Sequence, residues 1–84
     1  MRVSVISAER SVFEGEAASV VAPAYDGLVG ILPRHAPFMT LLGKGIVTIS
    51  SSGGDKRIHV ASGFLQVARD VVRIVAGSAT PADS

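Results

Sequence analysis

The 84-residue sequence predicts an all-β protein, an antiparallel β-sandwich or flattened barrel, and three observations support this class. In several segments apolar residues alternate with polar ones, which is the period of a strand with one buried face. Turn-forming residues recur about every eight to twelve positions, as they do between the strands of a sandwich. No stretch of about twelve residues keeps a helical pattern. We therefore expect strands from one end of the chain to the other.

The earlier strands are indicated by β-branched residues. The segments at 2–7, 19–23 and 46–50 read RVSVIS, SVVAP and IVTIS, and they are rich in Val and Ile. Such side chains suit a pleated, half-buried surface. Gly53 and Gly54 follow the third segment and supply the positive φ that a tight hairpin needs.

The later strands show the clearest alternation. They are expected at 56–62 (KRIHVAS), 64–67 (FLQV) and 71–77 (VVRIVAG), with a turn at Arg69 and Asp70. Arg57, His59 and Arg73 are expected on the outer faces. The residues predicted to face the core are Ile58, Val60, Leu65, Val67, Val72, Ile74 and Ala76.

Length and composition limit the possible classes of protein. The chain has room for one domain, which we expect over residues 1–77, followed by a loose polar tail over residues 78–84. No apolar stretch approaches the roughly 20 residues of a membrane-spanning helix, and the N-terminus does not resemble a signal peptide, so we expect an intracellular protein. The net charge of +1 is spread along the chain and aromatic residues are few, which argues against nucleic-acid binding.

The residue types and their spacing do not indicate a catalytic site. The chain has two His and no Cys, so a zinc site would need carboxylate ligands at unfamiliar spacings. His59 is interpreted as a solvated strand residue, and Gly27 to Gly30 lacks the third glycine of a dinucleotide fingerprint. We therefore expect no catalytic residue, no metal and no cofactor.

The segment GILPRHAPF at 30–38 is the most distinctive part of the sequence. Pro33 and Pro37 fix φ and favour extended geometry in the residue before them, so a stiff, non-helical connection is expected around His35. In FMTLL at 38–42, Met39 and Leu41 are expected on the face opposite Phe38 and Leu42, so the strand is apolar on both sides. One of those faces must look outward unless another molecule covers it.

Several motifs in order carry a family resemblance. They are SAER at 7–10, VFEG at 12–15, VVAP at 20–23, GLVGILPRHAP at 27–37, GIV at 45–47 and SGFLQV at 62–67. Over about residues 2–76 the chain resembles the N-terminal β domain of the epsilon subunit of F-type ATP synthase. This is a small non-catalytic subunit of the central stalk of the enzyme complex.

The resemblance implies a ten-stranded antiparallel β-sandwich of two five-stranded sheets. It implies a rotor subunit that couples the gamma subunit to the loops of the membrane c-ring in a proton-transporting ATP synthase. Contact with the alpha/beta catalytic hexamer would be indirect. The expected location is the cytoplasmic face of the bacterial inner membrane, peripheral and not inserted.

The resemblance also assigns interface positions residue by residue. The implied gamma-subunit interface is formed by Ser7, Pro33, His35, Ala36, Pro37 and Thr40. The implied c-ring interface is formed by Asp26, Leu28 and Val29.

Three features depart from the family pattern. Leu28 stands where many relatives have an acidic residue, so an apolar contact with the ring can replace a charged one. Arg34 stands where glycine or asparagine is common. The sequence ends at Ser84, whereas the family usually continues into two helices that restrain ATP hydrolysis, so we expect a short form without that inhibitory region, with a cut longer chain as the open alternative.

Two other function classes were weighed against this one. A stand-alone small β-barrel module that binds oligonucleotides or sugars would bind without gamma and in a salt-sensitive way. A small hydrolase built on His35 would show activity in the isolated chain.

Overall fold

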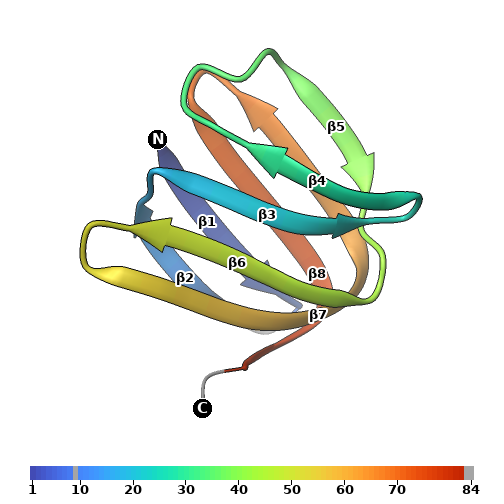
Figure 1. The fold of residues 1–84 in the computed structure, drawn as a ribbon. Helices are drawn as coiled ribbons and strands as arrows, with labels where there is room; N and C mark the ends of the chain where they lie inside the picture. The colour runs from blue at the N-terminus through green and yellow to red at the C-terminus, as the bar shows by residue number, and fades with distance from the viewer. Residues whose placement is uncertain (9, 83–84) are drawn as a thin grey trace.

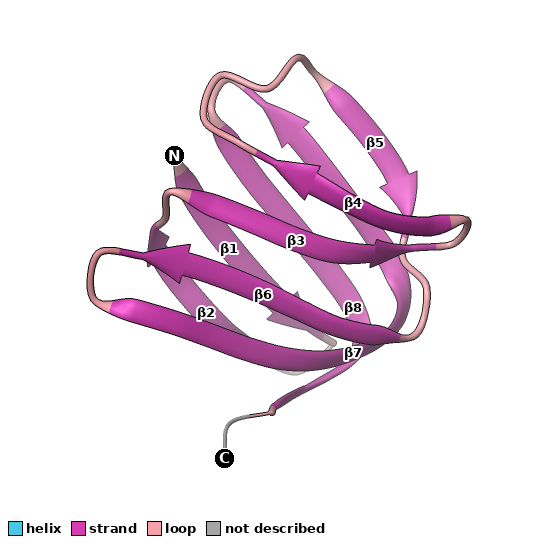
Figure 2. Cartoon of the chain, viewed as in Figure 1, coloured by secondary structure: helices cyan, strands magenta, loops and turns pink. Residues whose placement is uncertain are grey.

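Every element in the described part of the chain is a β-strand (Figure 2). The structure is a computed structural model that describes residues 1–8 and 10–82. Within these residues no helix could cross a membrane. The strands are β1 (Arg2–Ser7), β2 (Ser11–Glu16), β3 (Ser19–Ala24), β4 (Gly27–Ile31), β5 (Phe38–Leu41), β6 (Gly45–Ser51), β7 (Gly54–Ala68) and β8 (Val71–Pro81). The all-β prediction is confirmed.

Two long strands fold one continuous sheet into two layers (Figure 1). The register of β7 and β8 pairs Ala61 with Ser78 and Gly63 with Ala76, so Ser62 and Gly77 interrupt the ladder. Gly63 has φ of 114°, and a Cβ there would overlap the carbonyl oxygen of Val75. Only glycine fits this bend, where the strands change layer.

Each half of β7 and β8 therefore belongs to a different layer. The second half of β7 and the first half of β8 lie with β2, β1 and β5, whereas the other halves lie with β6, β3 and β4. The structure thus has eight strands in place of the expected ten, because β7 and β8 each count in both five-stranded layers. The predicted β-sandwich is confirmed in this form.

One pair departs from the predicted antiparallel arrangement. β1 and β8 run parallel, with Val3 opposite Val72 and Val5 opposite Ile74. The prediction rested on hairpins, whose short turns force antiparallel pairing. No short turn joins β1 to β8, so the turn pattern did not determine their relative direction.

The core consists of apolar side chains from the inner faces of both layers, and the alternation predicted them. Ile58, Val60, Leu65, Val67, Val72, Ile74 and Ala76 are all buried, as expected. Arg57, His59 and Arg73 are exposed on the outer faces, as expected. Val3, Val5, Val20, Val47 and Ile49 complete the centre of the core.

The last strand continues past the domain boundary expected from the sequence. Residues 78–81 pair with residues 58–61 of β7, and Ala79 is buried opposite Val60. The Ala82 amide then donates to the Arg57 carbonyl at 2.8 Å. Strand pairing needs only backbone groups, so the small polar residues of this segment did not indicate it. The rest of the expected tail, residues 83–84, lies outside the described residues.

Candidate partner-binding surface

The connection between β4 and β5 contains a tight turn at its start. The His35 amide donates to the Leu32 carbonyl at 3.1 Å, which closes a four-residue turn. Pro33 fixes φ at the second position, and Arg34 at the third position has φ of 66°. This is the pattern of a type II turn, whose third position favours glycine or asparagine. The connection is non-helical, as predicted, and Arg34 occupies a position that glycine or asparagine would adopt with less strain.

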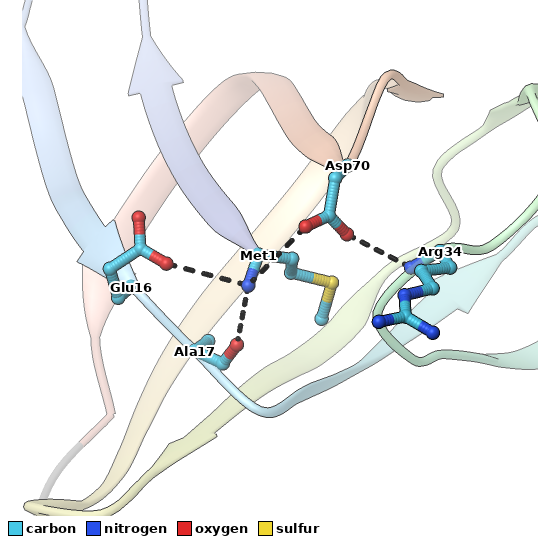
Figure 3. Close-up of polar contacts among 5 residues, drawn as sticks. All are labelled: Met1, Glu16, Ala17, Arg34 and Asp70. Atoms are coloured by element: carbon cyan, nitrogen blue, oxygen red, sulfur yellow. Dashed lines mark hydrogen bonds and ion pairs between the residues drawn. The ribbon is translucent and has the colours of Figure 1, made fainter.

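A carboxylate from another turn holds this connection (Figure 3). Asp70, in the turn between β7 and β8, accepts a hydrogen bond from the Arg34 amide at 2.9 Å. Its other carboxylate oxygen lies 3.9 Å from the amino group of Met1. That amino group also lies 3.4 Å from Glu16 and donates to the Ala17 carbonyl at 3.1 Å. These contacts connect the loop to the end of the sandwich at which β1 begins.

His35 is half-buried and makes contacts within its own segment. Its Nδ1 lies 2.7 Å from the Ala36 carbonyl oxygen and donates to it, since a carbonyl oxygen can only accept. The imidazole ring meets Phe38 edge-on, with ring centroids 5.7 Å apart. Ala36 and Pro37 are exposed beside it. These contacts orient the ring and leave part of its surface open to a partner.

β5 has the two-faced character that the sequence predicted. Phe38 packs against the core and Leu42 is buried, whereas Met39 and Leu41 are 63% and 62% exposed. Thr40 shares the inner direction of Phe38 but is only half-buried. It is less covered because β5 pairs with β7 alone and forms the edge of its layer. The outer face of β5 is therefore an exposed apolar surface on an edge strand.

The end of β5 is joined to the turn between β3 and β4. The Tyr25 amide donates to the Leu41 carbonyl at 3.1 Å, and the Gly43 amide donates to the Pro23 carbonyl at 2.7 Å. A Cβ on Gly43 would lie 2.8 Å from the carbonyl oxygen of Ala24, so the close approach of the two segments depends on this glycine.

An open hollow of about 510 Å³ lies between these two segments. Its lining residues are Ala24, Tyr25, Asp26, Phe38, Met39, Thr40, Leu41 and Phe64. Asp26, expected at the c-ring, and Thr40, expected at gamma, therefore line the same hollow. The two implied interfaces meet here.

The remaining implied positions are distributed unevenly. Leu28 is 76% exposed on the turn side of β4, whereas Val29, the next residue, packs partly against the core. Alternation along a strand sends neighbouring side chains to opposite faces, so Leu28 and Val29 do not share a surface.

Ser7 lies apart from the other implied gamma positions. It ends β1, which is separated from β5 by β8 and β7 in the same layer. Its hydroxyl donates to the Arg10 carbonyl at 3.3 Å, and it lines a different hollow with residues 77–80.

Three surface residues to which the sequence reasoning assigned no binding role contribute to this region. Tyr25, in the turn between β3 and β4, is 69% exposed. Leu32, directly after β4, is 63% exposed. The sequence could have indicated Tyr25, because Asp26 and Gly27 predict a turn and an aromatic residue directly before a turn is expected near the surface. Asp70 was expected as a turn residue, but its contact with Arg34 gave no signal, because the two residues are 36 positions apart in sequence.

The chemistry of this surface suits binding. Over residues 1–8 and 10–82, no group of three or more His, Cys, Asp or Glu side chains could hold a metal ion. The exposed side chains are large and apolar, with one carboxylate, Asp26, at the hollow. We name the surface formed by Tyr25, Leu32, His35, Met39, Thr40 and Leu41 the β5 surface, and Tyr25, Met39, Thr40 and Leu41 in it line the hollow.

The family model described as ATP synthase, Delta/Epsilon chain, beta-sandwich domain matches residues 1–82. The chain is 41% identical over 80 residues to the ATP synthase epsilon chain of Moorella thermoacetica, covering 94% of this chain and 60% of that one. It is 43% identical over 82 residues to the ATP synthase epsilon chain of Thioalkalivibrio sulfidiphilus, covering 95% and 58%. The chain thus spans about three fifths of the length of these relatives.

Two solved structures share the fold. One is a chain of the Euglena gracilis mitochondrial ATP synthase OSCP/F1/c-ring structure, with a TM-score of 0.86 at 23% identity, covering 94% of this chain and 51% of that one. The other is a chain of the Tetrahymena thermophila mitochondrial ATP synthase central stalk/c-ring structure, with a TM-score of 0.75 at 16% identity, covering 94% and 64%. At these identities the likeness establishes the sandwich architecture.

Proposed function

We propose, because the chain belongs to the ATP synthase delta/epsilon-chain β-sandwich family, that it is a non-catalytic central-stalk subunit of an F-type proton-transporting ATP synthase. Its role is to couple the gamma subunit to the c-ring during rotation. The relatives named ATP synthase epsilon chain support this proposal. The exposed apolar face of β5 is the observation that carries it.

The β5 surface is the proposed site for gamma. Met39 and Leu41 project from an edge strand, and exposed apolar clusters of this kind mark interaction sites. A standard interface buries about 800 Å² on each partner. The whole accessible surface is 4984 Å², so gamma would cover roughly a sixth of it. His35 and Thr40 would then lie inside the contact.

The β3–β4 turn is the proposed site for the c-ring loops. Asp26 and Leu28 both lie on its exposed side, and Leu28 offers an apolar contact. Val29 would support the turn from the core side. In this arrangement the alpha/beta hexamer is reached only through gamma, and the subunit is peripheral at the cytoplasmic face of a bacterial inner membrane.

Binding to gamma tests the first site. His35→Arg and Thr40→Arg each add a bulky charge to the β5 surface, so each should weaken co-purification with gamma by about tenfold or more. The matched control is Ile46→Arg, because Ile46 is 39% exposed on the outer face of the other layer. The control should bind gamma as the unmodified chain does. Equal binding by all four proteins would contradict the site.

A single cysteine tests the second site, since the chain has no cysteine of its own. Leu28→Cys should form a disulfide with a cysteine placed in a c-subunit loop in the assembled complex. Ser52→Cys is the control, because the β6–β7 turn lies at the far end of its layer from the β3–β4 turn (Figure 1). Cross-linking at position 52 and none at 28 would contradict the site.

A further inference from the structure

We propose that Asp70 is a positioning residue for the β5 surface, because its carboxylate holds the strained Arg34 turn that precedes β5. As it concerns the proposed gamma site, this inference rests on the proposed function. It assigns a role to a residue that lies in a different turn and accepts a hydrogen bond from one backbone amide of the loop.

The turn that is held carries backbone strain. Arg34 has φ of 66°, in the left-handed region that a side chain with a Cβ disfavours. Pro33 before it fixes φ but leaves ψ free, so a flip of the Pro33–Arg34 peptide would relieve the strain and would turn the Arg34 amide to a new direction. The Leu32 to His35 hydrogen bond is compatible with both orientations of that peptide, so another group must oppose the flip.

Asp70 supplies that group from the turn between β7 and β8, because its carboxylate accepts a hydrogen bond from the Arg34 amide. It lies in a two-residue turn in which Arg69 and Asp70 have φ of 54° and 63°. This turn closes the ladder between Ala68 and Val71, at the end of two strands that pair with each other along most of their length. The carboxylate therefore projects from the central hairpin toward a peripheral loop (Figure 3). A hydrogen bond from an amide to a carboxylate is stronger than one between neutral groups.

The geometry extends this effect to the proposed interface. The Arg34 amide that Asp70 holds is adjacent to the His35 amide that closes the turn. His35 then contacts Ala36 and Phe38, so its ring direction follows from the turn. The amino group of Met1, just before β1, lies near the other Asp70 carboxylate oxygen, and Glu16 in β2 lies near the same amino group.

Two substitutions at position 70 distinguish the effect of the carboxylate on the Arg34 amide from the effect of residue 70 on the backbone of its own turn. Asp70→Gly removes the acceptor but keeps a residue that adopts positive φ without strain. Asp70→Asn keeps one acceptor oxygen and also tolerates positive φ. Asp55→Gly is the control, because Asp55 is an exposed carboxylate in the β6–β7 hairpin.

The first readout is hydrogen exchange of the Arg34 amide in the 84-residue chain alone. Asp70→Gly should speed this exchange about three- to tenfold, whereas Asp70→Asn and Asp55→Gly should stay within about twofold. The second readout is affinity for gamma, which should fall about three- to tenfold for Asp70→Gly and be restored in Asp70→Asn. In an Arg34→Gly background the strain is absent, so Asp70→Gly should change affinity by less than about twofold.

Unchanged Arg34 exchange in Asp70→Gly would overturn the inference, whatever gamma does. Faster exchange with unchanged gamma affinity would also overturn it, because the loop would move without consequence for binding. If the unmodified chain fails to bind gamma, the proposed function fails, and the exchange result still decides whether Asp70 holds the turn.

Discussion

The β7–β8 hairpin and the edge strand β5 contain similar apolar residues but place them in opposite surroundings. Leu65 in β7 and Ile74 in β8 are fully buried, whereas Met39 and Leu41 in β5 are more than 60% exposed. Around Leu65 and Ile74, β7 and β8 have paired neighbours on both sides, whereas β5 pairs with β7 alone. The same kind of side chain therefore stabilises the fold in the first region and remains available to a partner in the second.

This difference separates stability from binding. Changes in the hairpin should lower the free energy of unfolding, because they remove buried contacts. Changes on the outer face of β5 should leave that free energy nearly unchanged. Four variants distinguish the contributions of the two regions to stability.

Leu65→Ala should have the largest effect. Leu65 is fully buried in the centre of the hairpin, so the substitution leaves a cavity and should cost about 3 kcal/mol of unfolding free energy. Urea denaturation followed by circular dichroism measures this loss. A loss below about 1 kcal/mol would show that the hairpin is not the rigid centre of the fold.

Gly63→Ala should cost about 2 kcal/mol, because the residue combines positive φ with a close carbonyl. The Cβ would overlap the carbonyl oxygen of Val75, at the bend where β7 changes layer. Gly30→Ala is the matched control, since a Cβ there meets nothing within 4 Å. Thermal unfolding of both variants compares them, and equal melting temperatures would contradict the importance of the bend.

Phe38→Ala tests the inner face of β5 and should cost about 1.5 kcal/mol, about half the loss at Leu65. Phe38 is half-buried, packs on the core and also supports the His35 ring. Urea denaturation gives the loss in stability. A loss as large as that of Leu65→Ala would mean that the edge strand belongs fully to the core.

The double variant Met39→Ala and Leu41→Ala should have the smallest effect on stability, within about 0.5 kcal/mol. Both side chains are mostly exposed, so little buried contact is lost. The same denaturation experiment applies. A loss above about 1.5 kcal/mol would show that these residues stabilise the fold itself, which would contradict a role limited to partner binding.

The hairpin could be predicted from the sequence, because the alternation of apolar and polar residues in each strand indicates which face is buried. The alternation of Ile58 with His59 and of Ile74 with Arg73 identified the core faces correctly. The parallel pairing of β1 with β8 and the extension of β8 to Pro81 could not be predicted. Both depend on backbone partners far away in sequence.

The β5 surface was predicted in part. Pro33 and Pro37 indicated the connection, and FMTLL indicated a strand apolar on both faces, since both are local patterns. The hydrogen bond from Arg34 to Asp70 was not predicted, because it joins two turns that only the folded sandwich brings together. The family resemblance supplied Ser7 and Val29 by position, and the structure places them apart from the exposed face of β5.

Calorimetric titration of gamma with two matched variants tests the central claim most directly. Leu41→Glu places a charge on the exposed face of β5, and Ile46→Glu places the same charge on the exposed face of the other layer. We predict that Leu41→Glu weakens gamma binding about tenfold or more and that Ile46→Glu leaves it unchanged. Unchanged binding by Leu41→Glu, or a greater loss from Ile46→Glu, would contradict the account.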